Sequence, residues 1–382
     1  MRAAVFSPVV VLLFAASVAP RVSAGGVDAQ GAATPPPPLE GVRLNVPIPV
    51  VPDVEVFTPS SYSPTGAKKP LLVFLHGFCL PDAEQQEYSF TGSRASATTP
   101  PRQQTLSQVG LRDLVETEDF VYVTPTAPHA TRYCALCNVG EDSPNVGDRL
   151  TVRWINSTLA RTAPAFACPA WDGSDACCNP ELGGRGDDAS FVKAVVDAVV
   201  DRYAIDTSRI YLMGIATGGF MANRMACEYA DVFAGVATFA GGVWADADKC
   251  VAGGGGENGV TNVLNVHGDG DLTVPIGGGV NFAGVPFPSA DQTVDTFARK
   301  FGCDALPREV AAADDGDDFS LPSDGRRDVD VSVTKFEGCG ADGAYVVEQW
   351  TLAGVDHFMQ EKTSRGVFKA VVQWLTSKRR AP

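Results

Sequence analysis

Residues 209–219 join a short apolar run to three glycines, a pattern typical of a strand that turns sharply into a helix. The centre of this segment reads Gly214, Ile215, Ala216, Thr217 and Gly218. In a Gly-x-Ser-x-Gly turn, the central serine hydroxyl attacks carboxylic esters. Alanine occupies that position here. The turn therefore has the spacing for acyl transfer but lacks the attacking oxygen.

A nucleophile of this kind needs an acid and then a histidine later in the chain, each in a loop after a strand. His357 follows the apolar run 344–352 and is the candidate base. Asp269 and Asp271 follow the run 261–267, and either can supply the acid or simply hydrogen-bond a tight turn. His267, at the end of that run, is interpreted as a structural part of its loop, as is His76 at the end of an earlier run.

The same chemistry needs two donors for the developing oxyanion. We expect one from the backbone N–H of Phe78 or Cys79, in the glycine turn that follows the apolar run 70–76. The second is the backbone N–H of Thr217, directly after the centre of the turn. Because these donors are backbone groups, the predicted oxyanion hole survives loss of the serine side chain. The Thr217 hydroxyl is expected to point away from the line of attack.

These residues must be positioned by strands and helices that alternate along the chain. Buried or alternating apolar runs predict strands at 70–76, 119–124, 209–214, 233–239, 261–267, 329–337 and 344–352. Amphipathic spacing predicts helices at 187–203, 218–230, 289–301 and 365–378. This alternation predicts an α/β fold with a mostly parallel central sheet and helices on both faces.

The amino-terminal residues predict export from the cell. Residues 1–24 combine Arg2, an apolar run and small residues before Ala24, which is typical of a signal peptide. The alternative, a membrane anchor, is disfavoured because Pro8 and Pro20 interrupt the run. Residues 25–45 form a Pro-rich leader, and 46–382 are the predicted folded domain. The net charge of −15 argues against a nucleic-acid partner, and we expect no membrane association.

Ten cysteines fit an oxidising compartment. Residues 131–186 are rich in Cys, Pro, Asn and Gly, and we interpret them as an insertion held by disulfides. Spacing alone leaves open the partners of Cys79, Cys134, Cys137, Cys168, Cys177 and Cys178. The Cys-x-x-Cys pair lacks a second such pair or nearby histidines, so we expect neither a metal nor another cofactor. Asn156 begins a glycosylation sequon.

Several motifs in order give the chain a family resemblance. They are "LLVFLHGF", "WDGSDACCN" with "DDASFV", "RIYLMGIATGGFMANRMACEYADVFAGVATFAGG", "VLNVHGDGDLTVPIGGG" and "QWTLAGVDHF". Across residues 65–377 the chain resembles the secreted polyhydroxybutyrate depolymerases and feruloyl esterases, which are α/β-hydrolases related to esterase D. The resemblance implies an α/β-hydrolase fold and a site for carboxylic esters, with Asp271 as acid and His357 as base. It also implies disulfides Cys227–Cys250 and Cys303–Cys339.

The chain departs from this family at three positions of the site. Ala216 replaces the nucleophile, Leu272 stands where proline is usual, and Phe358 follows the base where a small residue is common. Two functions remain open. The first is a catalytically impaired esterase fold that binds an ester-bearing small molecule or polymer. The second is an active esterase that uses another nucleophile, or whose true residue 216 is serine.

Overall fold

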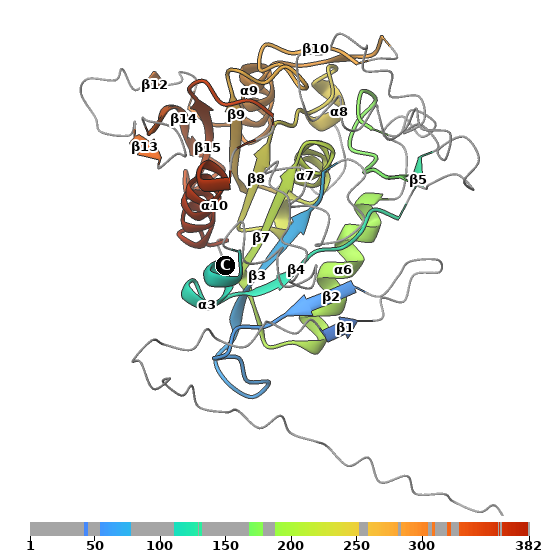
Figure 1. Ribbon diagram of the computed structural model, residues 1–382, viewed down its shortest axis with the longest axis vertical. Coiled ribbons are helices and arrows are strands. Elements are labelled where there is room, and N and C mark those ends of the chain that lie inside the picture. Colours follow the sequence, from blue (N-terminus) through green and yellow to red (C-terminus); the bar gives the residue numbers. More distant parts are fainter. Residues whose placement is uncertain are drawn as a thin grey trace, which may run out of the picture. The chain divides into compact units, whose positions relative to one another are not determined.

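The computed structural model describes residues 42–44, 54–77, 111–128, 130–131, 168–178, 188–251, 259–281, 284–304, 308–309, 319–321, 328–357, 359 and 361–380 (Figure 1). The chain divides into two units, Met1–Pro38 and Leu39–Pro382, and every described residue belongs to the second. The predicted signal peptide and almost all of the leader lie outside these residues. Asn156 and most of the predicted insertion also lie outside them.

One large sheet dominates the described part of the chain. Its strands lie in the order β1-β2-β4-β3-β7-β8-β9-β15-β14-β12, and β13 also pairs with β14. In chain order the strands are β1 (Val42–Leu44), β2 (Val54–Phe57), β3 (Lys69–Leu75), β4 (Val121–Val123), β7 (Ile205–Ile215), β8 (Gly235–Phe239), β9 (Asn262–Gly268), β12 (Arg308–Glu309), β13 (Phe319–Leu321), β14 (Val329–Cys339) and β15 (Tyr345–Leu352). Two small ladders pair β5 (Ala130–Thr131) with β6 (Cys168–Pro169), and β10 (Gly279–Val280) with β11 (Pro286–Phe287).

The centre of the sheet is parallel and its margins are antiparallel. β4, β3, β7, β8, β9 and β15 run in one direction. β2 and β14 pair antiparallel at the two ends of this block. Because the block is parallel, the loops after β3, β7, β9 and β15 all leave from the same edge of the sheet. The candidate oxyanion, nucleophile, acid and base positions are in those four loops.

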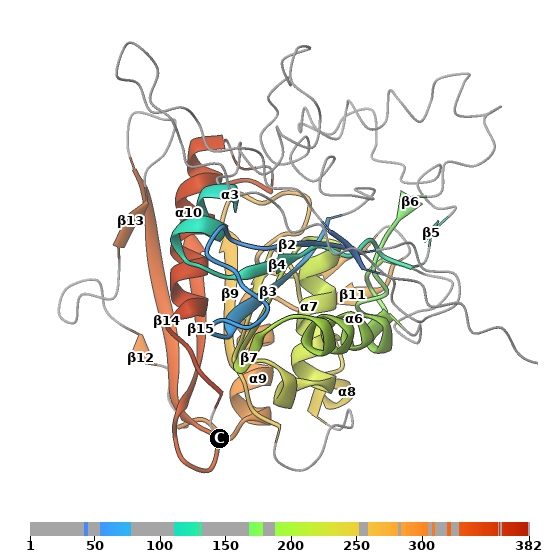
Figure 2. The ribbon, with the colours of Figure 1, turned by 90° about the horizontal axis from the view of Figure 1, so that it is seen from below.

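Helices cover both faces of the sheet (Figure 2). One face carries α6 (Asp188–Arg202), α7 (Thr217–Glu228), α8 (Asp248–Val251) and α9 (Ala290–Lys300), and the other carries α3 (Leu111–Thr117) and α10 (Glu361–Thr376). A short 3-10 helix, η2 (Ala230–Val232), follows α7. A separate apolar core lies on each face. The predicted α/β-hydrolase fold, with a mostly parallel sheet between two helical layers, is confirmed.

Local sequence explains why the central elements form where they do. All seven residues of β3 are buried, as a strand covered on both faces requires. Helix α9 begins with a capping box, in which Ser289 accepts the Gln292 N–H and the Gln292 side chain accepts the Ser289 N–H. The sequence patterns do not predict helix α3 or the strands β1 and β2, because such short elements give little periodic signal.

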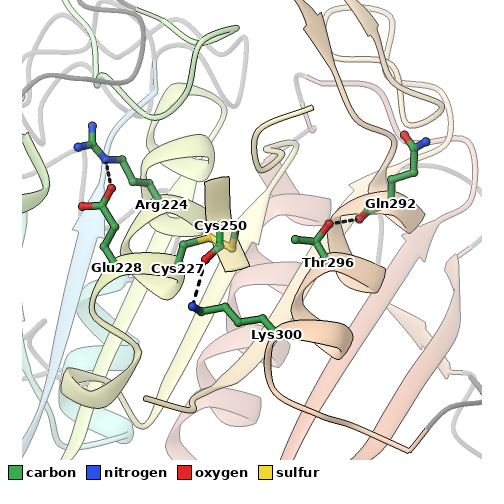
Figure 3. Close-up of a disulfide and its surroundings, with 7 residues drawn as sticks. All are labelled: Arg224, Cys227, Glu228, Cys250, Gln292, Thr296 and Lys300. Atoms are coloured by element: carbon green, nitrogen blue, oxygen red, sulfur yellow. Dashed lines mark hydrogen bonds and ion pairs between the residues drawn. A yellow bond between two sulfur atoms is a disulfide. The ribbon is translucent and has the colours of Figure 1, made fainter. Parts of the chain in front are cut away.

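Disulfides connect the helices to their surroundings. Cys227 on α7 is bonded to Cys250 on α8, and Lys300 of α9 donates to the Cys250 carbonyl at 3.1 Å (Figure 3). Cys303, just after α9, is bonded to Cys339 at the end of β14. These are the two pairs that the family resemblance implied. Cys177 and Cys178, whose partners the sequence left open, are bonded to each other.

Candidate active site

The turn between β7 and α7 has the backbone of a nucleophile elbow. Ala216 has φ 49° and ψ −113°, a conformation that residues with a Cβ rarely adopt. Its N–H donates to the Phe239 carbonyl at 2.8 Å, and its carbonyl accepts the Phe220 N–H at 3.0 Å. The neighbouring strand and the first turn of α7 thus hold this strained residue in place. The backbone bend is present although the side chain is only a methyl group.

Glycines permit the bend because other backbone atoms approach them closely. A Cβ on Gly214 would lie 2.0 Å from the Gly218 carbonyl oxygen. A Cβ on Gly218 would lie 2.2 Å from the carbonyl oxygen of Leu75, at the end of β3. The second contact places the elbow directly against the strand that leads into the predicted oxyanion loop. The glycine spacing is therefore explained by packing.

The candidate acid and base meet although 86 positions separate them. His357 Nδ1 lies 2.7 Å from Asp271 Oδ2, and both side chains are largely buried, at 7% and 1% exposure. A proton on Nδ1 donates to the carboxylate and leaves Nε2 as the basic nitrogen of the ring. This is the arrangement by which a carboxylate orients a general base. Asp269, the other candidate acid, instead accepts the Gly354 N–H at 2.6 Å.

The loops that carry the acid and the base are joined along their length. The Asp269 N–H donates to Leu352 O and the Gly270 N–H to Val355 O, each at 3.1 Å. A Cβ on Gly268 would lie 2.0 Å from Val355 O, so glycine allows the two loops to touch. Backbone contacts therefore fix the position of the Asp271–His357 pair independently of those two side chains.

The surroundings of Asp271 favour its charged form. Burial raises its pKa, but hydrogen bonds from His267 and His357, and from the Val274 N–H, outweigh burial and hold the pKa well below the ordinary 3.8. Its Oδ1 accepts the N–H groups of Thr273 and Val274, both at 2.8 Å. Asp271 is thus a carboxylate at neutral pH, as a partner for a protonated His357 must be.

A cavity of about 20 Å³, room for about one water molecule, brings the pair and the elbow together. Asp271 and His357 line it, as does Ile215, the residue before Ala216. Phe239 and Met359 are among the apolar residues that complete its wall. An apolar wall lowers the local dielectric and strengthens the hydrogen bond between carboxylate and imidazole.

The oxyanion side of the site is described only in part. Phe78 and Cys79, the candidates for the first donor, lie outside the described residues. Thr217 begins α7, and its hydroxyl donates to the His76 carbonyl at 3.4 Å. His76 is completely buried; its Nδ1 donates to Gly77 O at 2.6 Å, and its Nε2 accepts the Ala127 N–H at 2.9 Å. It thereby ties the loop after β3 to the loop after β4.

His76 predicts a loss of stability in mild acid. Burial lowers the pKa of His76 from 6.5 to about 4. Between these two pH values the imidazole is protonated in the unfolded chain and neutral in the folded chain. The contribution of His76 to the free energy of unfolding is complete above about pH 6.5. It falls by about 3 kcal/mol in total as the pH drops to about 4. Urea unfolding of the wild type should show this decrease in the free energy of unfolding between pH 6.5 and about 4, and the His76→Gln variant should lack it. Equal slopes in both proteins would contradict the assignment. Asp271 loses its contribution only below pH 3.8.

The segment that contains the elbow matches a known protein family. Residues 146–255 match the family described as Esterase PHB depolymerase. This match covers less than a third of the chain. The matched range includes α6, the elbow and α7, whereas Asp271 and His357 lie beyond it. The family resemblance read from the motifs is confirmed over this segment.

Two relatives carry the same resemblance. Feruloyl esterase C of Emericella nidulans is 28% identical over 161 residues, covering 42% of this chain and 52% of the relative. Poly(3-hydroxyalkanoate) depolymerase C of Paucimonas lemoignei is 28% identical over 200 residues, covering 46% and 41%. The chain thus spans about half the length of these relatives. Acetyl xylan esterase from Aspergillus awamori has a similar solved structure, with TM-score 0.49, 15% identity, and coverage of 88% of this chain and 98% of that one.

Two residues make contacts around Asp271 that the sequence analysis did not foresee. His267, interpreted from sequence as a structural part of its loop, contacts the Val274 carbonyl of that loop, and its Nε2 also lies 3.4 Å from Asp271 Oδ2. Asp269 was weighed only as an acid or a turn residue, and it joins the acid loop to the base loop. The spacing of His267 four residues before Asp271, across a glycine turn, is the signal that could have indicated the first contact.

Proposed function

We propose that this protein binds a carboxylic ester at the elbow and the Asp271–His357 pair and does not form an acyl-enzyme with it. Acyl transfer in this fold requires a side-chain oxygen at the apex of the elbow. Ala216 supplies none. Without that oxygen, the base has no side-chain hydroxyl proton to remove, and no acyl-enzyme can form at the apex.

The observation that carries the proposal is the backbone of Ala216. Its positive φ is the geometry that presents an apex side chain for attack, and here the side chain presented is a methyl group. The acid–base pair beside it is assembled at 2.7 Å. The site is therefore built for ester chemistry and lacks one atom.

The competing function is an active esterase that uses another nucleophile. The first candidate for that nucleophile is the Thr217 hydroxyl. This hydroxyl donates to the His76 carbonyl and is buried with the residue 5% exposed. A hydroxyl engaged with a carbonyl on the oxyanion side is not paired with His357. This contact supports binding without covalent catalysis.

The substrates of the relatives suggest the kind of ligand. A feruloyl esterase and a poly(3-hydroxyalkanoate) depolymerase point to hydroxycinnamate esters or a polyester as the ester-bearing molecule. We further propose that the protein acts outside the cell, with residues 1–24 as its signal peptide and 46–382 as its folded domain. Structural disulfides favour such an oxidising compartment. Among the described residues, no helix is both long and apolar enough to cross a bilayer.

Wild-type protein should bind methyl ferulate or a 3-hydroxybutyrate oligomer in calorimetry, and mass spectrometry should recover the ester intact. Its rate with p-nitrophenyl acetate should equal that of His357→Ala, because no nucleophile depends on the base. A fluorophosphonate probe should leave the peptide containing residues 209–219 unmodified. Turnover that His357→Ala abolishes, or failure to bind either ester, would overturn the proposal.

A further inference from the structure

A second histidine reaches the carboxylate of Asp271. His267 is the sixth residue of β9, where it pairs in register with Thr351 of β15, and it is 3% exposed. Its position is therefore fixed by two central parallel strands. Its Nε2 lies 2.7 Å from the Val274 carbonyl oxygen and 3.4 Å from Asp271 Oδ2.

These contacts determine which ring nitrogen carries the proton. Nε2 faces a carbonyl and a carboxylate, and both groups are acceptors, so Nε2 must be the donor. Nδ1 is buried and has no hydrogen-bond partner among the described residues. His267 thus donates from Nε2.

The same contacts make His267 part of the acid's framework. Both backbone polar groups of Val274 are held, because its carbonyl accepts from His267 and its N–H donates to Asp271 Oδ1. Oδ2 lies between two imidazoles, with His357 at 2.7 Å and His267 at 3.4 Å. Loss of the His267 donor would release the Val274 carbonyl and one side of Oδ2 together.

We propose that His267 is a positioning residue that sets the rotamer of Asp271 and thereby keeps the proton of His357 on Nδ1. It does so by donating from Nε2 to the Val274 carbonyl and the near side of the carboxylate. It touches no reacting atom. This inference rests on the proposed ester site, but its first test requires no turnover.

Two substitutions with side chains of similar length distinguish a role as hydrogen-bond donor from a role in packing alone. His267→Gln keeps an amide N–H that can reach the Val274 carbonyl, whereas His267→Met fills similar space without a donor. If His267 only fills the core, the two variants should behave alike. If its N–H positions Asp271, only the methionine variant should disturb His357.

The first measurement is NMR of protein labelled with ¹⁵N-histidine. The chain has four histidines, so the ring signals can be assigned by single substitutions. We expect a hydrogen-bonded Nδ1 proton from His357 in the wild type and in His267→Gln, and its loss or strong broadening in folded His267→Met. Near-UV circular dichroism verifies folding. An unchanged Nδ1 signal in His267→Met, or equal loss in both variants, would overturn the proposal.

The second measurement places both variants in an Ala216→Ser background. With p-nitrophenyl acetate, adding His267→Met should lower kcat ~10- to 100-fold with little change in KM, since misplacing a catalytic group slows chemistry. Adding His267→Gln should retain most of kcat. If Ala216→Ser is itself inert, the ester-site proposal fails while the NMR result still decides the role of His267. Equal kcat in the two variants would contradict positioning.

Discussion

Ala216→Ser should convert this protein into an esterase, raising its hydrolysis of p-nitrophenyl acetate by on the order of 10³-fold or more. The reason is that the bend of the elbow and the acid–base pair are already formed. The apex backbone has the required bend, and the His357–Asp271 hydrogen bond is formed at 2.7 Å. The new hydroxyl needs no rearrangement of the main chain. Labelling of residue 216 by a fluorophosphonate, followed by mass spectrometry, gives a second readout that does not depend on substrate choice.

The chain offers a matched control for this gain of function. Ala240 has φ 48° and the same 9% exposure as Ala216, but it follows β8. Ala240→Ser adds a hydroxyl at a residue of similar φ that lines the same cavity as Asp271 and His357 but is not the apex of the elbow, and it should gain no activity. Adding His357→Ala to Ala216→Ser should remove the gain. A folded Ala216→Ser that is neither active nor labelled would mean that the site is not assembled for acyl transfer.

Gly218→Ala should destabilise the protein by about 3 kcal/mol or more, because overpacking against backbone leaves no flexible group to move aside. The added methyl would lie 2.2 Å from Leu75 O and 2.5 Å from His76 O. Relief requires the elbow to separate from the end of β3. Chemical unfolding should show the loss of stability, and near-UV circular dichroism should show disturbed packing even where the protein still folds.

Gly277→Ala is the control for Gly218→Ala. A Cβ on Gly277 meets no atom within 4 Å, so the change in stability should stay within about 0.5 kcal/mol. The comparison separates the intrinsic effect of replacing glycine from the effect of the close contact. Equal stability of the two variants would contradict the tight approach of the elbow to β3.

The main elements of the fold and the acid–base pair could be predicted because their signals are local and ordered. The run and glycines at 209–219 indicate a strand, a turn and a helix, and β7 and α7 lie there. The order of acid and base along this fold indicated His357 and left Asp269 or Asp271 as the acid, and the family resemblance implied Asp271. Their hydrogen bond follows from parallel strands that end at one edge.

The contacts around the pair could not be predicted, because they depend on side-chain direction and on loops that meet in space. Nothing in the spacing of Asp269 shows that it accepts the Gly354 N–H. The contact of His267 could not be predicted without knowing that the Val274 carbonyl turns back toward β9. The bond between Cys177 and Cys178 was open for the same reason, since pairing among ten cysteines is set by the folded chain.

The joined loops after β9 and β15 also bear on how a ligand enters. Asp269, Gly270 and Gly354 hold one loop to the other through three hydrogen bonds. Parting the acid from the base would break those bonds at once, so both loops should shift as one rigid piece. We therefore expect room for a bulky ligand to come from other parts of the site.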